Sequence, residues 1–134
     1  MSAVAPRRWI LPAVLVGVGY ASVGVLFALP PTNVLVWRRA AWVVCLIAFL
    51  AHIAYERLHF RNPTRLTALH VALAVALGAF GLAAAANIHS LWTGTGNQER
   101  LLLALAIWPI ITAVPAYLVA LLIGAVLGRF SGRN

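Results

Sequence analysis

The chain has 134 residues, of which 63% are hydrophobic and only 9% are charged. This composition, with a mean hydropathy of +0.96, excludes an ordinary soluble domain and predicts an integral membrane protein. The formal net charge of +8 comes from ten arginines set against Glu56 and Glu99. Because the arginines stand at the ends of apolar segments and form no patch on a polar surface, they indicate membrane topology and argue against nucleic-acid binding.

Four apolar runs predict four transmembrane helices, since about 20 apolar residues cross a bilayer. We expect them at about residues 9–29, 36–58, 64–91 and 101–127, so that residues 1–134 form a single transmembrane domain. Seven arginines fall on the side of the two termini and the middle turn, and three fall on the other side. This bias predicts cytoplasmic termini. The expected fold is an all-α, up-down bundle that spans a cell inner membrane four times.

The first predicted helix follows a basic N-terminal flank, an arrangement typical of a signal peptide. The apolar run continues to Leu29, so we expect a retained span, with a cleaved signal as the alternative because residues 17–21 include small residues. Pro30 and Pro31 should end this helix. Small residues share one of its faces, which is a usual contact surface between membrane helices. They are Ala13, Gly17, Ala21, Gly24 and Ala28.

The second and third helices carry nearly all the ionisable side chains that enter the membrane. One stripe, at steps of three and four, consists of Ala41, Cys45, Ala48, His52, Tyr55 and His59, with Glu56 beside Tyr55. A second stripe consists of Thr67, His70, Ala74, Gly78, Gly81 and Ala85. If residues 60–62 reverse the chain, the two stripes face each other in a close hairpin. The expected level pairs are His52 with His70, Tyr55 with Thr67, Ala48 with Ala74 and Cys45 with Gly78.

The turns on either side of the third helix contain capping residues. Asn62 before Pro63 predicts an N-cap followed by the first helical position. Before the fourth helix, either Thr95 with Gln98 or Asn97 alone serves as the cap.

His52, His70, Tyr55 and Glu56 form the candidate cofactor-binding or proton site, because an ionisable side chain inside a membrane indicates a function. A carboxylate and an imidazole in contact share a proton. The same groups could hold a quinone carbonyl or ligate the iron of a b-type haem. The alternative is a structural role, in which His52 hydrogen-bonds a neighbour and sets the hairpin register. No metal is assigned, because the Glu-x-x-His motif that di-iron bundles use twice occurs once, at Glu56 and His59.

Two functional interpretations follow. The first is a non-enzymatic subunit or homo-oligomer that packs through its Gly/Ala faces, within a larger membrane complex. The second is a redox, quinone or proton-coupled transport protein that uses the His/Tyr/Glu cluster, with haem as the candidate cofactor. Enzymatic catalysis is disfavoured, because no serine stands at helical spacing from a core histidine. The expected partners are the lipid bilayer and other membrane subunits or copies of the chain. The sequence specifies no substrate.

Overall fold

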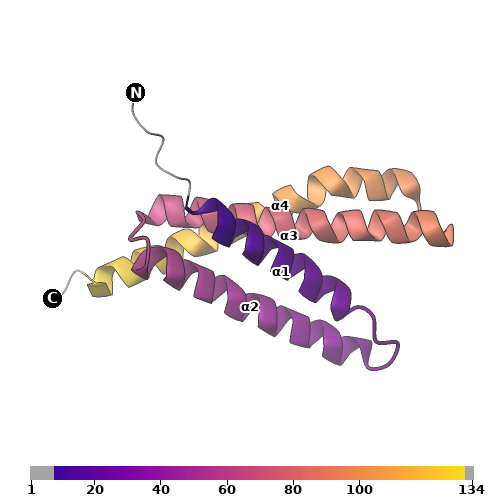
Figure 1. The fold of residues 1–134 in the computed structure, drawn as a ribbon, viewed down its shortest axis with the longest axis horizontal. Coiled ribbons are helices and arrows are strands. Elements are labelled where there is room, and N and C mark those ends of the chain that lie inside the picture. Colours follow the sequence, from indigo (N-terminus) through magenta and orange to yellow (C-terminus); the bar gives the residue numbers. More distant parts are fainter. Residues whose placement is uncertain (1–7, 132–134) are drawn as a thin grey trace.

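A computed structural model describes residues 8–131 and contains four α-helices and no strand within them (Figure 1). These helices are α1 (Ile10–Leu26), α2 (Val34–Leu58), α3 (Thr64–Thr93) and α4 (Gln98–Ser131). The last three are long and apolar enough to cross a membrane, whereas α1, with 17 residues, is apolar but shorter. The prediction of an all-helical fold with long apolar helices, typical of a membrane protein, is therefore confirmed.

The helix ends follow the predicted turns in part. Asn97 caps α4, because its Oδ1 accepts a hydrogen bond from the backbone N–H of Arg100 at 3.1 Å. The prediction that Asn62 caps α3 was wrong. Pro63 is the N-cap residue, and no side chain supplies a capping hydrogen bond there. The Asn62 side chain is thereby available for another partner.

α3 is the helix against which both α1 and α4 pack, and small residues bring the backbones close. A Cβ atom on Gly17 of α1 would lie 2.9 Å from the carbonyl oxygen of Ala74 on α3. A Cβ on Gly78 would lie 2.6 Å from Cβ of Tyr20. Contacts this short leave no room for side chains, so both glycines are required by the α1–α3 contact.

The prediction of a close hairpin between α2 and α3 through Gly78 was wrong. Gly78 faces Gly17 and Tyr20 of α1, and α1 lies beside α2 in Figure 1. Cys45 and Ala48 of α2 pack against a cluster that α1 and α3 build together. The physical reason is that α1 carries a small-residue face of its own, which competes with α2 for the glycine stripe of α3.

α2 joins the bundle mainly near its C-terminal end. There Ile53 forms a fully buried cluster with Ala68 and Val71 of α3 and Ala120 of α4. At the same end, a Cβ on Gly124 would lie 2.7 Å from Cγ2 of Thr64, so α4 also approaches the start of α3 closely. Three helices thus enclose the region around the turn between α2 and α3.

Candidate functional site

Four buried polar residues and a half-buried fifth lie around the turn between α2 and α3, and we call them the carboxylate cluster. The buried residues are His52 and Glu56 on α2 and Thr67 and His70 on α3, and the half-buried residue is Asn62 in the turn. Glu56 has no exposed surface. An acidic side chain in such a position requires polar partners, because an isolated carboxylate is strongly disfavoured in a hydrocarbon environment.

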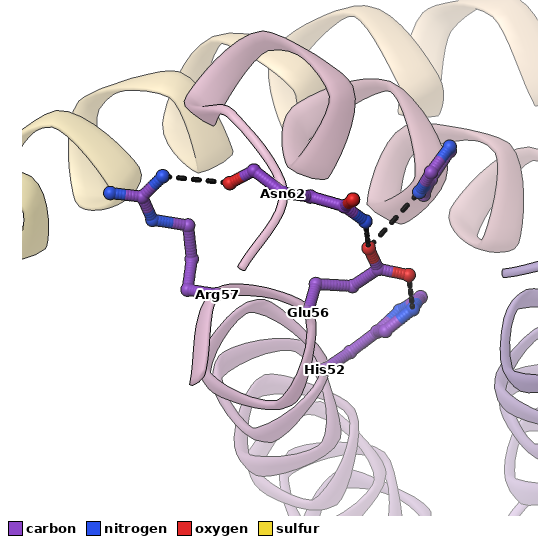
Figure 2. Close-up of polar contacts among 5 residues, drawn as sticks. His52, Glu56, Arg57 and Asn62 are labelled. Atoms are coloured by element: carbon purple, nitrogen blue, oxygen red, sulfur yellow. Dashed lines mark hydrogen bonds and ion pairs between the residues drawn. The ribbon is translucent and has the colours of Figure 1, made fainter. Parts of the chain in front are cut away.

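The backbone of the turn folds Asn62 back over the end of α2. Arg61 adopts a left-handed conformation with φ of 51°. The N–H of Asn62 donates to the carbonyl oxygen of Glu56 at 3.4 Å, and Arg57 Nη1 donates to the carbonyl oxygen of Asn62 at 2.8 Å. In this position Asn62 Nδ2 donates to Oε2 of Glu56 (Figure 2). The turn therefore supplies the first partner of the carboxyl group.

His70 of α3 supplies the second partner. Its Nδ1 lies 3.0 Å from Oε2 of Glu56, at hydrogen-bonding distance, with the proton carried by either group. The Trp9 ring stacks on the His70 ring, with centroids 4.2 Å apart and planes 4° apart. Trp9 is the residue directly before α1, so three parts of the chain fix the position of one imidazole.

His52 completes the cluster without a hydrogen bond. Its Nε2 lies 3.9 Å from Oε1 of Glu56 (Figure 2), which is beyond hydrogen-bonding distance. Within the described residues, both ring nitrogens of His52, Oε1 of Glu56 and Oγ1 of Thr67 are buried without a hydrogen-bond partner. Buried polar atoms are normally paired. Oε2 of Glu56 therefore has two hydrogen-bond partners, whereas Oε1 and the nearby ring nitrogens of His52 have none.

The chemistry available to this arrangement is proton exchange. Glu56 and His70 can exist as a carboxylate with an imidazolium or as a carboxylic acid with a neutral imidazole, and both forms have no net charge. His52, with free nitrogens near Oε1, can accept a further proton after a movement of about 1 Å brings it to hydrogen-bonding distance. Among the described residues, the ionic partners of Glu56 are His52 and His70, and no arginine binds it.

Three of the four residues predicted for the site lie together, and the fourth does not. His52, Glu56 and His70 share the cluster, whereas Tyr55 is 44% exposed and stacks on His59 with ring centroids 5.0 Å apart. At 100° per residue, Glu56 is rotated about 40° from His52 and Tyr55 about 60° in the opposite sense. The buried face of α2 therefore includes Glu56 and excludes Tyr55.

The sequence interpretation did not assign Asn62 and Trp9 to the site. Asn62 had a plausible local role as a cap, and its actual role depends on the left-handed backbone at Arg61. Trp9 is brought to His70 by the packing of α1 on α3. One signal could have suggested Trp9. It stands at the start of the first predicted span, and the arginine bias puts that end on the same side of the membrane as the turn between the second and third spans.

A second polar group, which we call the amide cluster, closes the turn between α3 and α4. It consists of Asn87, Ser90, Thr95 and Gln98. Asn87 Nδ2 donates to the carbonyl oxygens of Ala83 at 2.9 Å and Leu101 at 2.7 Å, and its Oδ1 accepts from Gln98 Nε2 at 3.1 Å. Ser90 donates to the carbonyl oxygen of Thr95. This cluster contains no ionisable side chain.

The carboxylate cluster does not fit a haem bound by both predicted histidines. His52 and His70 both approach the carboxyl group of Glu56, so the space between the imidazoles contains a side chain of the protein. The stacked Trp9 also covers one face of His70. No group of three or more metal-ligating side chains within residues 8–131 is arranged to hold a metal ion.

No protein-family model matches the chain, and no curated protein or solved structure matches it either.

Proposed function

We propose that this chain is a proton-coupled membrane transport protein whose working element is the Glu56–His70 pair with His52 beside it. The observation that carries the proposal is the fully buried carboxyl group of Glu56, bonded to an imidazole at 3.0 Å and free of any arginine partner among the described residues. A carboxylate and histidine held in this way bind and release a proton with a small change in structure.

The proposed topology is a multi-pass, up-down bundle of four spans in a cell inner membrane, with both termini in the cytoplasm. The arginine distribution supports it, with Arg8, Arg57, Arg61, Arg65 and Arg129 on the expected cytoplasmic side. Arg7 and Arg133, which also entered that count, lie outside the described residues. With this orientation the carboxylate cluster lies one or two turns from the cytoplasmic surface, where protons are available.

Infrared difference spectroscopy tests proton binding without a known substrate. Reconstituted protein is cycled between acidic and alkaline buffer, and the carbonyl band of a protonated carboxylic acid is recorded. We expect Glu56→Gln to remove the pH-dependent band of a buried carboxyl group. Glu99→Gln is the matched control, because Glu99 is the other carboxylate of the chain and is exposed in the first turn of α4.

Proton flux into liposomes provides the functional measurement. Under an imposed membrane potential, a pH-sensitive dye inside the liposomes should report proton entry for the wild type and for His89→Gln, since His89 is exposed. Glu56→Gln and His70→Gln should each abolish it. A pH-dependent carboxyl band and a flux that both survive Glu56→Gln would contradict the proposal.

The alternative is a non-enzymatic subunit or homo-oligomer, and one observation favours it. α2 has 25 residues, and none of the residues in its most apolar 18-residue stretch is buried against the rest of the described chain. The predicted Gly/Ala faces now argue less for it, because Gly17, Gly24, Gly78 and Gly124 contact other helices of the same chain. Cross-linking through single cysteines on the outer face of α2 in native membranes distinguishes an assembly from a lipid-facing helix. A visible absorption spectrum of the purified protein separately tests any haem-dependent version of the redox hypothesis.

A further inference from the structure

A pocket of about 230 Å³ lies between the C-terminal ends of α2 and α4. Its lining combines two cations with aliphatic walls: Ala54, Arg57, Leu58, Arg61 and Leu127. Neither His52 nor Glu56 contributes to it. The pocket is therefore a separate feature from the carboxylate cluster, although the turn between α2 and α3 borders both.

The Arg57 side chain is held in place at this pocket. Nη1 donates to the carbonyl oxygen of Asn62 at 2.8 Å, and the side chain points away from Glu56 (Figure 2). On the α4 side, a Cβ atom on Gly128 would lie 3.1 Å from Nη2. The absence of a side chain at Gly128 thus leaves room for the guanidinium group between α2 and α4. A guanidinium fixed in this way retains further N–H donors for a ligand.

The two arginines of the pocket lack an acidic partner in the described chain. The ion pairs of Glu56 are made with His52 and His70, and Glu99 stands in the first turn of α4, at the other end of that helix. Guanidinium groups at a membrane surface bind phosphate oxygens well, because their paired N–H groups match the spacing of two oxygens. Two unpaired guanidinium groups beside one pocket therefore favour an anionic ligand.

We propose that this pocket binds an anionic phospholipid, with its phosphate on Arg57 and Arg61 and an acyl chain along Ala54, Leu58 and Leu127. The aliphatic walls favour a lipid over free phosphate, since free phosphate gains nothing from them. Basic pockets between membrane helices on the cytoplasmic side commonly bind lipid headgroups, and the arginine bias places this pocket on that side. The proposal does not depend on the proton site.

Native mass spectrometry of the purified full chain in a neutral detergent tests the proposal by counting bound lipids. Titration with phosphatidylglycerol should give one tightly bound equivalent, and phosphatidylcholine or inorganic phosphate should give none at the same concentration. Arg61→Gln should weaken binding about fivefold, and the double variant with Arg57→Gln about 25-fold. Arg39→Gln, at the exposed opposite end of α2, is the charge-matched control and should leave binding unchanged.

A pocket-filling variant separates the site from a general attraction of lipid to basic protein. Ala54→Phe keeps both arginines and occupies the aliphatic wall, so it should abolish the bound equivalent. Arg61 is exposed and makes no side-chain hydrogen bond within the described chain, so Arg61→Gln should fold even if Arg57→Gln does not. Equal binding of phosphate and lipid, an equal effect of Arg39→Gln, or full binding by Ala54→Phe would each overturn the proposal.

Discussion

The two ends of α3 carry buried polar clusters that differ in chemistry and in completeness. The amide cluster uses neutral groups, and none of its buried polar atoms lacks a partner in the described chain. The carboxylate cluster uses a glutamate and two histidines, and leaves His52 and one oxygen of Glu56 unbonded. Closing a turn between two membrane helices thus requires only amides and a hydroxyl. The turn between α2 and α3 could therefore be closed without a glutamate and two histidines, and their presence there supports a role in proton binding.

The two clusters also differ in the segments of the chain that supply their residues. The amide cluster draws its residues from α3, its following turn and the start of α4, all within a short stretch of sequence. The carboxylate cluster requires α2, the turn after it, α3 and the residue before α1. A cluster built from distant segments depends on the global packing, so disturbances of packing should affect it first.

The largest expected effect comes from removing the carboxyl group. Glu56→Ala leaves Asn62 Nδ2 and His70 Nδ1 buried without their acceptor, and should lower the free energy of unfolding by about 3–5 kcal/mol. Glu56→Gln keeps an acceptor oxygen in place and should cost about 1 kcal/mol or less. Unfolding by SDS titration in mixed micelles measures both. Equal, small losses for the two variants would show that the carboxylate cluster contributes no more than ordinary packing.

The next largest effect is expected for Gly78→Leu, which disturbs the packing of α1 on α3 and removes no polar group. Gly78→Leu inserts a side chain where a Cβ already lies 2.6 Å from Tyr20. It should destabilise the fold by about 1–3 kcal/mol or more through overpacking. It should also loosen α1 and increase the access of solvent to His70, because Trp9 precedes α1. Hydrogen exchange should rise around His70 and stay unchanged around Asn87.

Gly19→Leu is the matched control for this experiment. Gly19 belongs to α1, the helix that contacts Gly78, but a Cβ on Gly19 would meet no atom outside its own stretch of helix within 4 Å. The substitution should therefore be tolerated. If Gly78→Leu were equally tolerated, the face of α3 at Gly78 would be in contact with lipid and not with α1.

The sequence predicted the long apolar helices, because they follow from local hydropathy. It also gave Asn97 as one of two alternative caps of α4, and the structure shows the Asn97 bond to Arg100, three positions later. It did not predict that α1 meets Gly78, since α1, α2 and α3 all present small residues and hydropathy does not rank their pairings. Nor did it predict the role of Asn62, which depends on the backbone of Arg61.

A smaller effect is expected at the other end of α3. Asn87→Leu removes two hydrogen bonds donated to backbone oxygens and one accepted from Gln98. It should cost about 1–2 kcal/mol, in the range measured for polar contacts between membrane helices. The infrared band of Glu56 and the proton flux should not change. A loss of flux at unchanged folding would indicate that both clusters belong to one proton path, and would remove the functional distinction between them.

The smallest effect is expected for Tyr55→Phe, which separates the sequence prediction of the site from the structural one. The hydroxyl of Tyr55 belongs to an exposed side chain, and its ring packs beside His59 on the outer face of α2. Losing this hydroxyl should change the free energy of unfolding by no more than about 0.5 kcal/mol, as at other surface positions. Proton flux should remain at the wild-type level, measured in the same liposomes as Glu56→Gln. If Tyr55→Phe abolished flux while the protein stayed folded, α2 would have to rotate so that Tyr55 enters the site. The working state would then bury a face of α2 that is exposed here.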